Sequence, residues 1–294
     1  DCVYYEKEPE WASLVRLKSE GILNSFCIGY FPSMYGDERD RDIPARLKNY
    51  RRRYEKARKL GLLDYAYFYG CDEVKNLMNV ERSAAVFKNE FPDIPLVTTA
   101  IDNSCGTSGK LRSVDAYCPL VSAYRLEYAE EARRKGKQVW WYVCNYPRPP
   151  YANFFVESNG LGGRLLMGAK AVKYKVDGFL YYMISNWNNV RPIISGPFTD
   201  WNPYSHYLMN GDGSWTYVGP DGIPLASIRL ENFRDGLEDY AYVKILEEKL
   251  SKADPKSQWA ANARAALKVP KELVADLKNY ANDPSHLYVW RSRL

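Results

Sequence analysis

Short apolar and aromatic runs alternate along the chain with longer segments of helical periodicity. Six runs have the composition of strands, and they begin near residues 24, 63, 95, 114, 138 and 177. Most are separated by segments with apolar positions at helical spacing, such as 43–60, 76–89 and 123–135. Connections of this length join parallel strands. The pattern therefore predicts an α/β fold.

The form of α/β fold that we expect is a (β/α)8 barrel of the TIM type. The chain has 294 residues, and barrels of about 250 residues commonly form one domain. A barrel needs eight strands, so two are either hidden in the weakly patterned N-terminus or lie upstream. We therefore expect one barrel domain over residues 1–294, truncated or irregular at its N-terminus. Helices from about 225 to 294 would pack on it, and the run at 177 would be the eighth strand.

Charge and cysteine content exclude several function classes. The net charge of +5 is too small to indicate a polyanionic partner, and the basic segment 46–59 has the spacing of a solvated amphipathic helix. The six cysteines form no CxxC pair, and only two histidines are present. A histidine-based zinc site and a Ser-His-Asp triad are therefore not expected. We expect no cofactor, no nucleic-acid partner and no membrane span. The sequence leaves the oligomeric state open.

The segment 62–73, LLDYAYFYGCDE, is the main candidate for a functional site. An aromatic strand ends at Gly70-Cys71, and two carboxylates, Asp72 and Glu73, follow directly. Catalytic residues of α/β barrels lie at the carboxyl ends of the strands. The simpler alternative is that both acids open the next helix, where they would suit the positive end of the helix dipole.

The ends of the other predicted strands carry aromatic and amide side chains. These candidate substrate-binding residues are Tyr117, Trp141, Tyr142, Asn145, Asn186 and Trp187, with Asp200 and Trp201 further along the last loop. Aromatic rings stack on the apolar faces of sugars, while carboxylates and amides bond to sugar hydroxyl and acetamido groups. Neighbours on a strand point to opposite faces, so at most one of Trp140 and Trp141 should line the site. The set favours a glycan or glycoconjugate substrate.

Two adjacent acids restrict the mechanism. Glycosidases with two separate catalytic carboxylates hold them about 5–9.5 Å apart across the bond, usually on different strands. Consecutive acids suit the substrate-assisted route, in which the 2-acetamido group of the substrate is the nucleophile. One carboxylate would then stabilise the acetamido nitrogen, and the next would protonate the leaving oxygen.

The sequence resembles glycoside hydrolase family 123, whose catalytic domain overlaps the domain-of-unknown-function family 4091. The resemblance rests on Asp72-Glu73 after its strand and on the segments DGFLYYMISNWN (177–188), GDGSWTYVGPDG (211–222) and SIRLENFRDGLEDYAY (227–242). It implies a retaining exo-β-N-acetylgalactosaminidase with a (β/α)8 barrel and substrate-assisted catalysis. In this family pattern Asp72 is the acetamido stabiliser and Glu73 the general acid/base.

The resemblance also implies a bacterial enzyme of carbohydrate metabolism that is secreted, periplasmic or on the cell surface. The family usually carries a β-sandwich before the barrel, and this chain does not contain one. Val74 stands where members often have proline. A glycosidase acting on another sugar, or a carbohydrate-binding barrel without catalysis, remains an alternative.

The segment 227–242 carries Arg229, Arg234, Glu238 and Asp239 on a long predicted helix, 225–250. Ion pairs that fix the wall of the barrel are the favoured role for these charges. Gly236 lies inside the same helix, where glycine costs about 1 kcal/mol relative to alanine. We therefore expect close packing of this position against a neighbouring segment.

Overall fold

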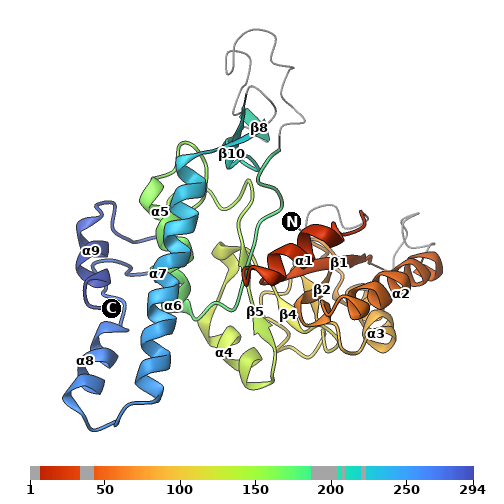
Figure 1. Cartoon of the computed structure of the whole chain (residues 1–294), viewed down its shortest axis with the longest axis horizontal. Helices are drawn as coiled ribbons and strands as arrows, with labels where there is room; N and C mark the ends of the chain where they lie inside the picture. Colours follow the sequence, from red (N-terminus) through yellow and green to blue (C-terminus); the bar gives the residue numbers. More distant parts are fainter. Residues whose placement is uncertain (1–6, 34–42, 187–203, 207–208, 220–222) are drawn as a thin grey trace. The chain divides into compact units, whose positions relative to one another are not determined.

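The computed structural model describes residues 7–33, 43–186, 204–206, 209–219 and 223–294 (Figure 1). The chain divides into two compact units, Asp1–Trp141 and Tyr142–Leu294. Figure 1 colours the first unit from red to yellow-green and the second from green to blue. The expectation of a single domain stays a prediction.

Unit 1 is built on a parallel sheet of five strands. These are β1 (Phe26–Phe31), β2 (Ala66–Gly70), β3 (Leu96–Thr98), β4 (Ala116–Tyr117) and β5 (Gln138–Val139). Their order in the sheet is their order in the chain, and each pair is parallel. This sequential arrangement is the strand order of a barrel wall, whereas doubly wound sheets reverse direction at a switch point.

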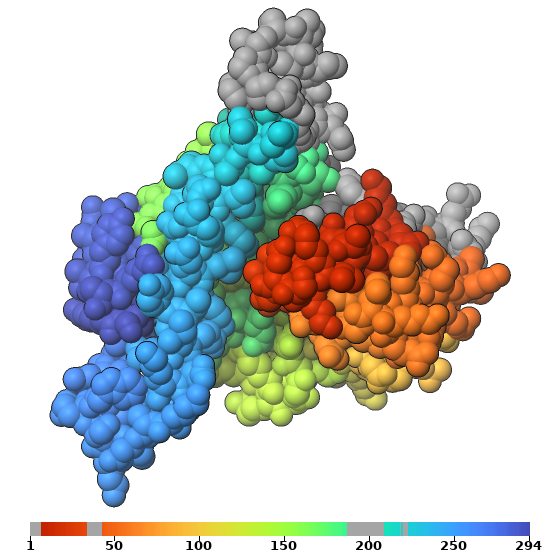
Figure 2. Space-filling model, viewed as in Figure 1, coloured from red at the N-terminus to blue at the C-terminus, as the bar shows by residue number. Residues whose placement is uncertain are grey.

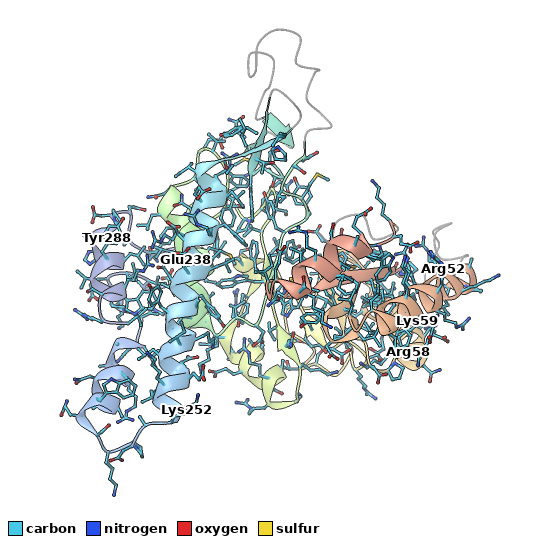
Figure 3. The ribbon with its side chains drawn as sticks, viewed as in Figure 1. Arg52, Arg58, Lys59, Glu238, Lys252 and Tyr288 are labelled. Atoms are coloured by element: carbon cyan, nitrogen blue, oxygen red, sulfur yellow. The ribbon has the colours of Figure 1, made fainter. Side chains whose placement is uncertain are left out.

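Four α-helices accompany the sheet of unit 1 in its described part. They are α1 (Trp11–Ser19), α2 (Ile43–Lys59), α3 (Leu77–Glu90) and α4 (Leu126–Arg134). The described part of this unit also contains two short 3-10 helices, η2 (Leu63–Tyr65) and η3 (Val121–Ala123). The basic helix α2 buries Tyr50 and Ala57 and keeps most of its charges outside, as expected. Figure 3 shows Arg52, Arg58 and Lys59 at its surface.

Aromatic side chains form the core beneath the sheet of unit 1. Phe68 of β2 packs against Tyr50 of α2, Phe87 of α3 and Phe91, with ring centroids 5.0–5.4 Å apart. All four side chains are buried. Aromatic residues bury large apolar areas, and tilted or edge-on contacts suit their charge distribution. Part of the aromatic excess in the sequence therefore belongs to the core.

Unit 2 is mainly helical. The segment 160–174 runs through α5 (Gly160–Leu165), the π-helical turn η4 (Leu166–Lys170) and α6 (Ala171–Tyr174). It packs along α7 (Ile228–Ser251), and α8 (Gln258–Ala266) and α9 (Ser285–Arg291) follow. The strands are short: β7 (Phe179–Leu180), which pairs with β6 (Trp141–Tyr142), and the antiparallel pairs β8 (Tyr204–His206) with β9 (Met209–Asn210) and β10 (Thr216–Val218) with β11 (Pro224–Ala226).

Two glycines allow the long helices of unit 2 to approach closely. A Cβ atom on Gly236 would lie 2.5 Å from the carbonyl oxygen of Arg164 and 2.7 Å from the Cβ of Met167. On Gly168 it would lie 3.1 Å from the Cβ of Asp239. These contacts confirm the expectation of close packing at Gly236. The space-filling view shows that one side of α7 is exposed at the molecular surface (Figure 2).

The α/β class and the parallel order are confirmed, while the complete eight-stranded barrel stays a prediction. Residues 7–25 contain α1 and no strand, so the described part of the N-terminus holds no hidden strand before β1. The run at 62–70 becomes a strand only from Ala66, because η2 occupies its start. The run at 138–144 divides into β5 and β6. Among the described residues, no helix is both long and apolar enough to cross a membrane.

Candidate active site

The two acids follow β2 in a tight turn with unusual backbone geometry. β2 ends at Gly70, where a Cβ atom would lie 2.2 Å from the carbonyl oxygen of Phe31 in β1, so this position needs glycine. Cys71 and Glu73 both have positive φ, +53° and +50°. Left-handed backbone costs a residue with a side chain roughly 1–2 kcal/mol and concentrates at functional sites. The turn places Asp72 between two strained residues.

The helix after the acids begins later than the simpler alternative requires. α3 starts at Leu77, and its N-cap is Asn76, whose side chain accepts a hydrogen bond from the amide of Asn79. Asp72 and Glu73 therefore lie outside the first turn of α3. The interpretation of the acid pair as a helix start is wrong.

Two hydroxyl groups hold the carboxylate of Asp72. Tyr69 Oη donates to Asp72 Oδ1 at 2.6 Å, and Thr99 Oγ1 donates to the same oxygen at 2.8 Å. The two hydroxyl oxygens are 2.7 Å apart. Asp72 Oδ2 has no hydrogen-bond partner among the described residues, and the side chain is exposed. One oxygen of Asp72 is thus fixed from the protein side, while the other is open to a ligand.

The backbone of the turn is held by the same group of side chains. The amide of Asp72 donates to Tyr30 Oη at 3.2 Å, and the amide of Glu73 donates to Thr99 Oγ1 at 3.3 Å. Tyr30 and Tyr69 lie on adjacent strands, with ring centroids 5.9 Å apart. The side chain of Glu73 is exposed. Residues of β1, β2 and the end of β3 therefore position both acids.

Two of the predicted binding residues in unit 1 are buried. Tyr117 lies in β4 with an exposed fraction of 3%, and its hydroxyl donates to the carbonyl oxygen of Leu111. Burial, followed by the charge of Asp102, raises the pKa of the Tyr117 phenol. Trp141 has an exposed fraction of 0% and packs edge-on against Tyr124. Trp140 is only partly buried and packs edge-on against Tyr67, so it presents more surface than Trp141.

The remaining predicted binding residues belong to unit 2 or are not described. Tyr142 in β6 is buried, and Asn145 accepts a weak hydrogen bond from the thiol of Cys144. Asn186 is buried, and its backbone bonds to Gly213 and Ser214. Trp187, Asp200 and Trp201 lie outside the described residues. The binding roles of all these residues stay predictions.

A polar cluster around Asp212 was missed in the sequence. The Asp212 side chain is fully buried and accepts hydrogen bonds from Tyr181 Oη at 3.1 Å and Tyr182 Oη at 3.0 Å. Burial and the charge of Asp212 raise the pKa of both phenols. The signal in the sequence was the glycine on each side of Asp212. Gly213 is needed because a Cβ atom at this position would lie 2.5 Å from Tyr182 Oη. The sequence indicated only a tight turn there.

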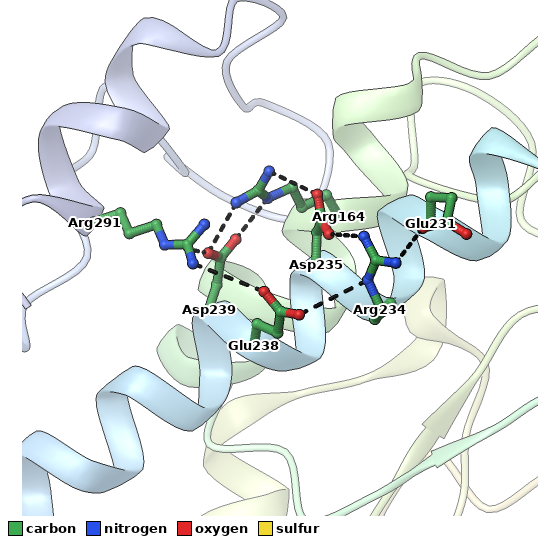
Figure 4. Close-up of polar contacts among 7 residues, drawn as sticks. All are labelled: Arg164, Glu231, Arg234, Asp235, Glu238, Asp239 and Arg291. Atoms are coloured by element: carbon green, nitrogen blue, oxygen red, sulfur yellow. Dashed lines mark hydrogen bonds and ion pairs between the residues drawn. The ribbon is translucent and has the colours of Figure 1, made fainter.

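The charged segment 227–242 forms ion pairs within unit 2, while the expected role of these pairs in fixing a barrel wall stays a prediction. Arg164 on α5 makes a two-pronged contact with Asp239, with distances of 2.7 and 3.0 Å (Figure 4). Arg291 of α9 lies 3.3 Å from the same carboxylate. Arg234 pairs with acids of its own helix, and Arg229 donates to the carbonyl oxygen of Ser214. No group of three or more potential metal ligands occurs in the part of the chain that the structure describes.

Comparison with known proteins gives one family and a structural neighbour. The model of the glycoside hydrolase 123 catalytic domain matches residues 49–246. A family 123 glycoside hydrolase from Clostridium perfringens, whose structural analysis concerns glycolipid glycan hydrolysis, is similar in fold, with a TM-score of 0.55 and 16% sequence identity. The similarity covers 88% of this chain and 44% of that protein, so the chain spans less than half of its length. No curated protein matches the chain.

Proposed function

Since the chain belongs to glycoside hydrolase family 123, we propose that it is a retaining β-N-acetylhexosaminidase acting on terminal β-linked N-acetylgalactosamine. The observation that carries this proposal is the geometry of Asp72, held at one oxygen by Tyr69 and Thr99 in a strained turn after β2. The strand order of unit 1 also supports a (β/α)8 barrel as the complete fold. The structural neighbour makes glycolipid glycans a reasonable class of substrate.

Asp72 is proposed to orient the acetamido group of the substrate. Its Oδ2 atom can accept the acetamido N–H, while Oδ1 stays fixed by the two hydroxyls. The acetamido oxygen then attacks the anomeric carbon, and the C–O bond to the leaving group breaks. Positive charge develops on the resulting oxazolinium ring, next to the carboxylate. Electrostatic stabilisation of such charge by a preorganised group is a major source of catalysis.

Glu73 is proposed to move the proton in both steps. In the first step its carboxylic acid protonates the glycosidic oxygen as that oxygen leaves. In the second step its carboxylate removes a proton from water, and the water opens the oxazolinium ring at the anomeric carbon. Two inversions at this carbon give net retention. The exposed position of Glu73 leaves it accessible to a leaving group and to water.

The other predicted residues complete the proposed site by binding the sugar. They are Tyr117, Trp141, Tyr142, Asn145, Asn186, Trp187, Asp200 and Trp201. Among the described members of this set, Asn145 would contact a sugar hydroxyl group, and the buried residues would support it.

Substitution of the two acids tests the proposal. We expect Asp72→Asn and Glu73→Gln each to lower kcat/KM on an aryl β-N-acetylgalactosaminide by at least about 100-fold, because general acid–base catalysis alone contributes 10²–10⁴-fold. Asp64→Asn, a substitution in η2 before the same strand, is the matched control and should retain activity. Full activity in either acid variant would contradict the assignment.

A thiazoline analogue of the oxazolinium intermediate tests the mechanism separately. It should inhibit the wild-type protein competitively, because it resembles the state that the site stabilises. Hydrolysis without such inhibition would argue for a nucleophile from the protein. A panel of aryl glycosides that includes sugars without an acetamido group then identifies the sugar. Sugar binding without turnover of any glycoside would indicate a non-catalytic barrel.

A further inference from the structure

Unit 2 contains a cleft that no assigned role uses. Its volume is about 420 Å³, within the range of about 300–1,000 Å³ typical of small-molecule sites. The loop after β6 forms one wall, and the segment before α9 forms the other. Six of its lining residues carry the argument: Pro150, Tyr151, Ser158, Asn159, Tyr280 and Asn282.

The walls of this cleft offer flat apolar surfaces. Tyr151 and Tyr280 supply aromatic rings, and Pro149 and Pro150 supply pyrrolidine rings. Tyr280 is held from behind, because the ammonium group of the buried Lys170 lies 3.2 Å from its ring centroid. This contact fixes the ring of Tyr280, which is partly buried and lines the cleft. Flat rings of this kind pack against the apolar faces of cyclic ligands.

The same cleft contains polar atoms whose hydrogen bonds are incomplete. Ser158 Oγ is buried and has no hydrogen-bond partner among the described residues. Asn159 Nδ2 donates to Asn282 Oδ1 at 3.1 Å, which orients the Asn282 amide and leaves its Nδ2 group without a partner among the described residues. The exposed Asn282 amide can therefore donate to an oxygen atom of a ligand.

The charges at this cleft favour a neutral ligand. The lining contains one acid, Glu157, and one base, Lys278, so its formal charges cancel. Asn210 donates to Glu157 Oε1 through its backbone and side-chain amides. The ammonium group of Lys278 lies 5.3 Å from the centroid of the Tyr151 ring, in a cation–π contact. An adjoining cleft of about 400 Å³ shares Tyr280 but is lined by several charged side chains. The first cleft is thus the better match to an uncharged compound.

We propose that this cleft binds a neutral saccharide ring. Tyr151 and Tyr280 contact the apolar faces of the ring, while Asn282 bonds to its hydroxyl or acetamido groups. All residues of this proposed site belong to unit 2, and sugar binding there does not require hydrolysis at Asp72 and Glu73. The cleft would hold part of the glycan or a product sugar, and its loss would not by itself remove the proposed catalytic function.

Protein-observed NMR of the amide groups tests the proposal at residue resolution. The wild-type protein is titrated with free N-acetylgalactosamine, galactose and glucose, and with sorbitol as an open-chain polyol that lacks a ring. We expect saturable shifts of the Ser158 and Asn282 amides with at least one of the sugars. Dissociation constants should be in the millimolar range, because a single sugar ring has few atoms that can contribute binding energy. Sorbitol should produce no such shifts.

Matched variants identify the contacts. Tyr151→Ala and Asn282→Ala should each weaken binding about tenfold, while Asn262→Ala, an amide substitution on the exposed face of α8, should leave it unchanged. Tyr151→Phe should retain most of the affinity, because it keeps the ring face. Three results would each overturn the proposal: no shifts with any sugar, equal shifts with sorbitol, or unchanged affinity in both cleft variants. Hydrolysis assays of Asp72→Asn are independent of these outcomes.

Discussion

At the scale of single residues, the candidate site depends on contacts between the turn that carries Asp72 and Glu73 and residues of neighbouring strands. Asp72 and Glu73 are neighbours in the chain, but Thr99 is 27 positions from Asp72. The register of β2 and β3 pairs Gly70 with Thr98. Thr99 therefore follows β3 at the same edge of the sheet where Asp72 follows β2, and its hydroxyl reaches the carboxylate. Tyr69 reaches it from the strand itself.

Removal of one hydroxyl tests this arrangement. Tyr69→Phe keeps the ring and deletes a hydrogen bond to a charged group, which contributes about 1.5–3 kcal/mol. We expect kcat on an aryl β-N-acetylgalactosaminide to fall by about 10- to 100-fold, with little change in KM. Tyr65→Phe, a tyrosine in η2, should leave both constants unchanged. Equal kinetics in Tyr69→Phe and the wild-type protein would show that Tyr69 does not position Asp72.

At the scale of elements, α7 organises unit 2 through its charges and its glycine. Gly236 lets the segment 160–174 approach, and one turn later Asp239 meets Arg164 from that segment. The side chain of Asp239 has an exposed fraction of 1%, and its hydrogen bonds raise the pKa of Arg164. By contrast, Arg234 and Glu238 pair on the exposed side of α7. Figure 4 shows the buried and exposed pairs side by side.

The difference between the two kinds of ion pair gives a stability prediction. Asp239→Asn leaves Arg164 and Arg291 without their shared carboxylate, and loss of one partner of a buried pair costs about 3–5 kcal/mol. Arg234→Ala removes only exposed pairs, each contributing about 0–1 kcal/mol. Urea denaturation monitored by tryptophan fluorescence should show a large loss for Asp239→Asn and a small one for Arg234→Ala. Similar losses in both variants would contradict the assignment of Asp239 as a buried anchor.

At the scale of the whole molecule, stability depends on a buried lysine whose charge the fold disfavours. Lys170 has an exposed fraction of 0%, and its ammonium group contacts the Tyr280 ring and the carbonyl oxygen of Leu277. Burial lowers its pKa from 10.5 to about 7. Between these two values the unfolded chain binds more protons at this position than the folded protein. The free energy of unfolding should therefore rise with pH across that interval.

Lys170→Met tests this dependence, because methionine fills a similar volume without a charge. For the wild-type protein we expect the free energy of unfolding to increase by up to about 2 kcal/mol between pH 7 and pH 9, since one pKa unit corresponds to 1.36 kcal/mol. The interval stops at pH 9 because buried thiols and phenols, such as Cys105 with a pKa of about 12, act in the opposite direction above it. Lys170→Met should lose the increase, and Lys252→Met, at the exposed residue that follows α7, should keep it. The same slope in all three proteins would exclude Lys170 as its source.

The amino-acid sequence by itself determined the α/β class, the order of the main strands and the position of the acid pair. Periodicity carries this information, because a strand buried on both faces is a short apolar run and a surface helix alternates at 3.6 residues. The family resemblance was also visible in the sequence, and the match over residues 49–246 confirms it. Gly236 was recognisable because glycine is costly inside a helix unless a neighbour needs the space.

Only the tertiary structure decided which side chains meet. Thr99 beside Asp72, the two tyrosines around Asp212 and the paired arginines on Asp239 are separated from their partners by 27 to 75 residues. Local periodicity carries no information about such distances, because strand register and helix crossing set them. The same holds for Trp141 and Tyr117, whose positions near strand ends predicted open sites while packing buried both. The close contact of Gly70 with β1 and the strained turn that follows it are likewise not visible in any local pattern.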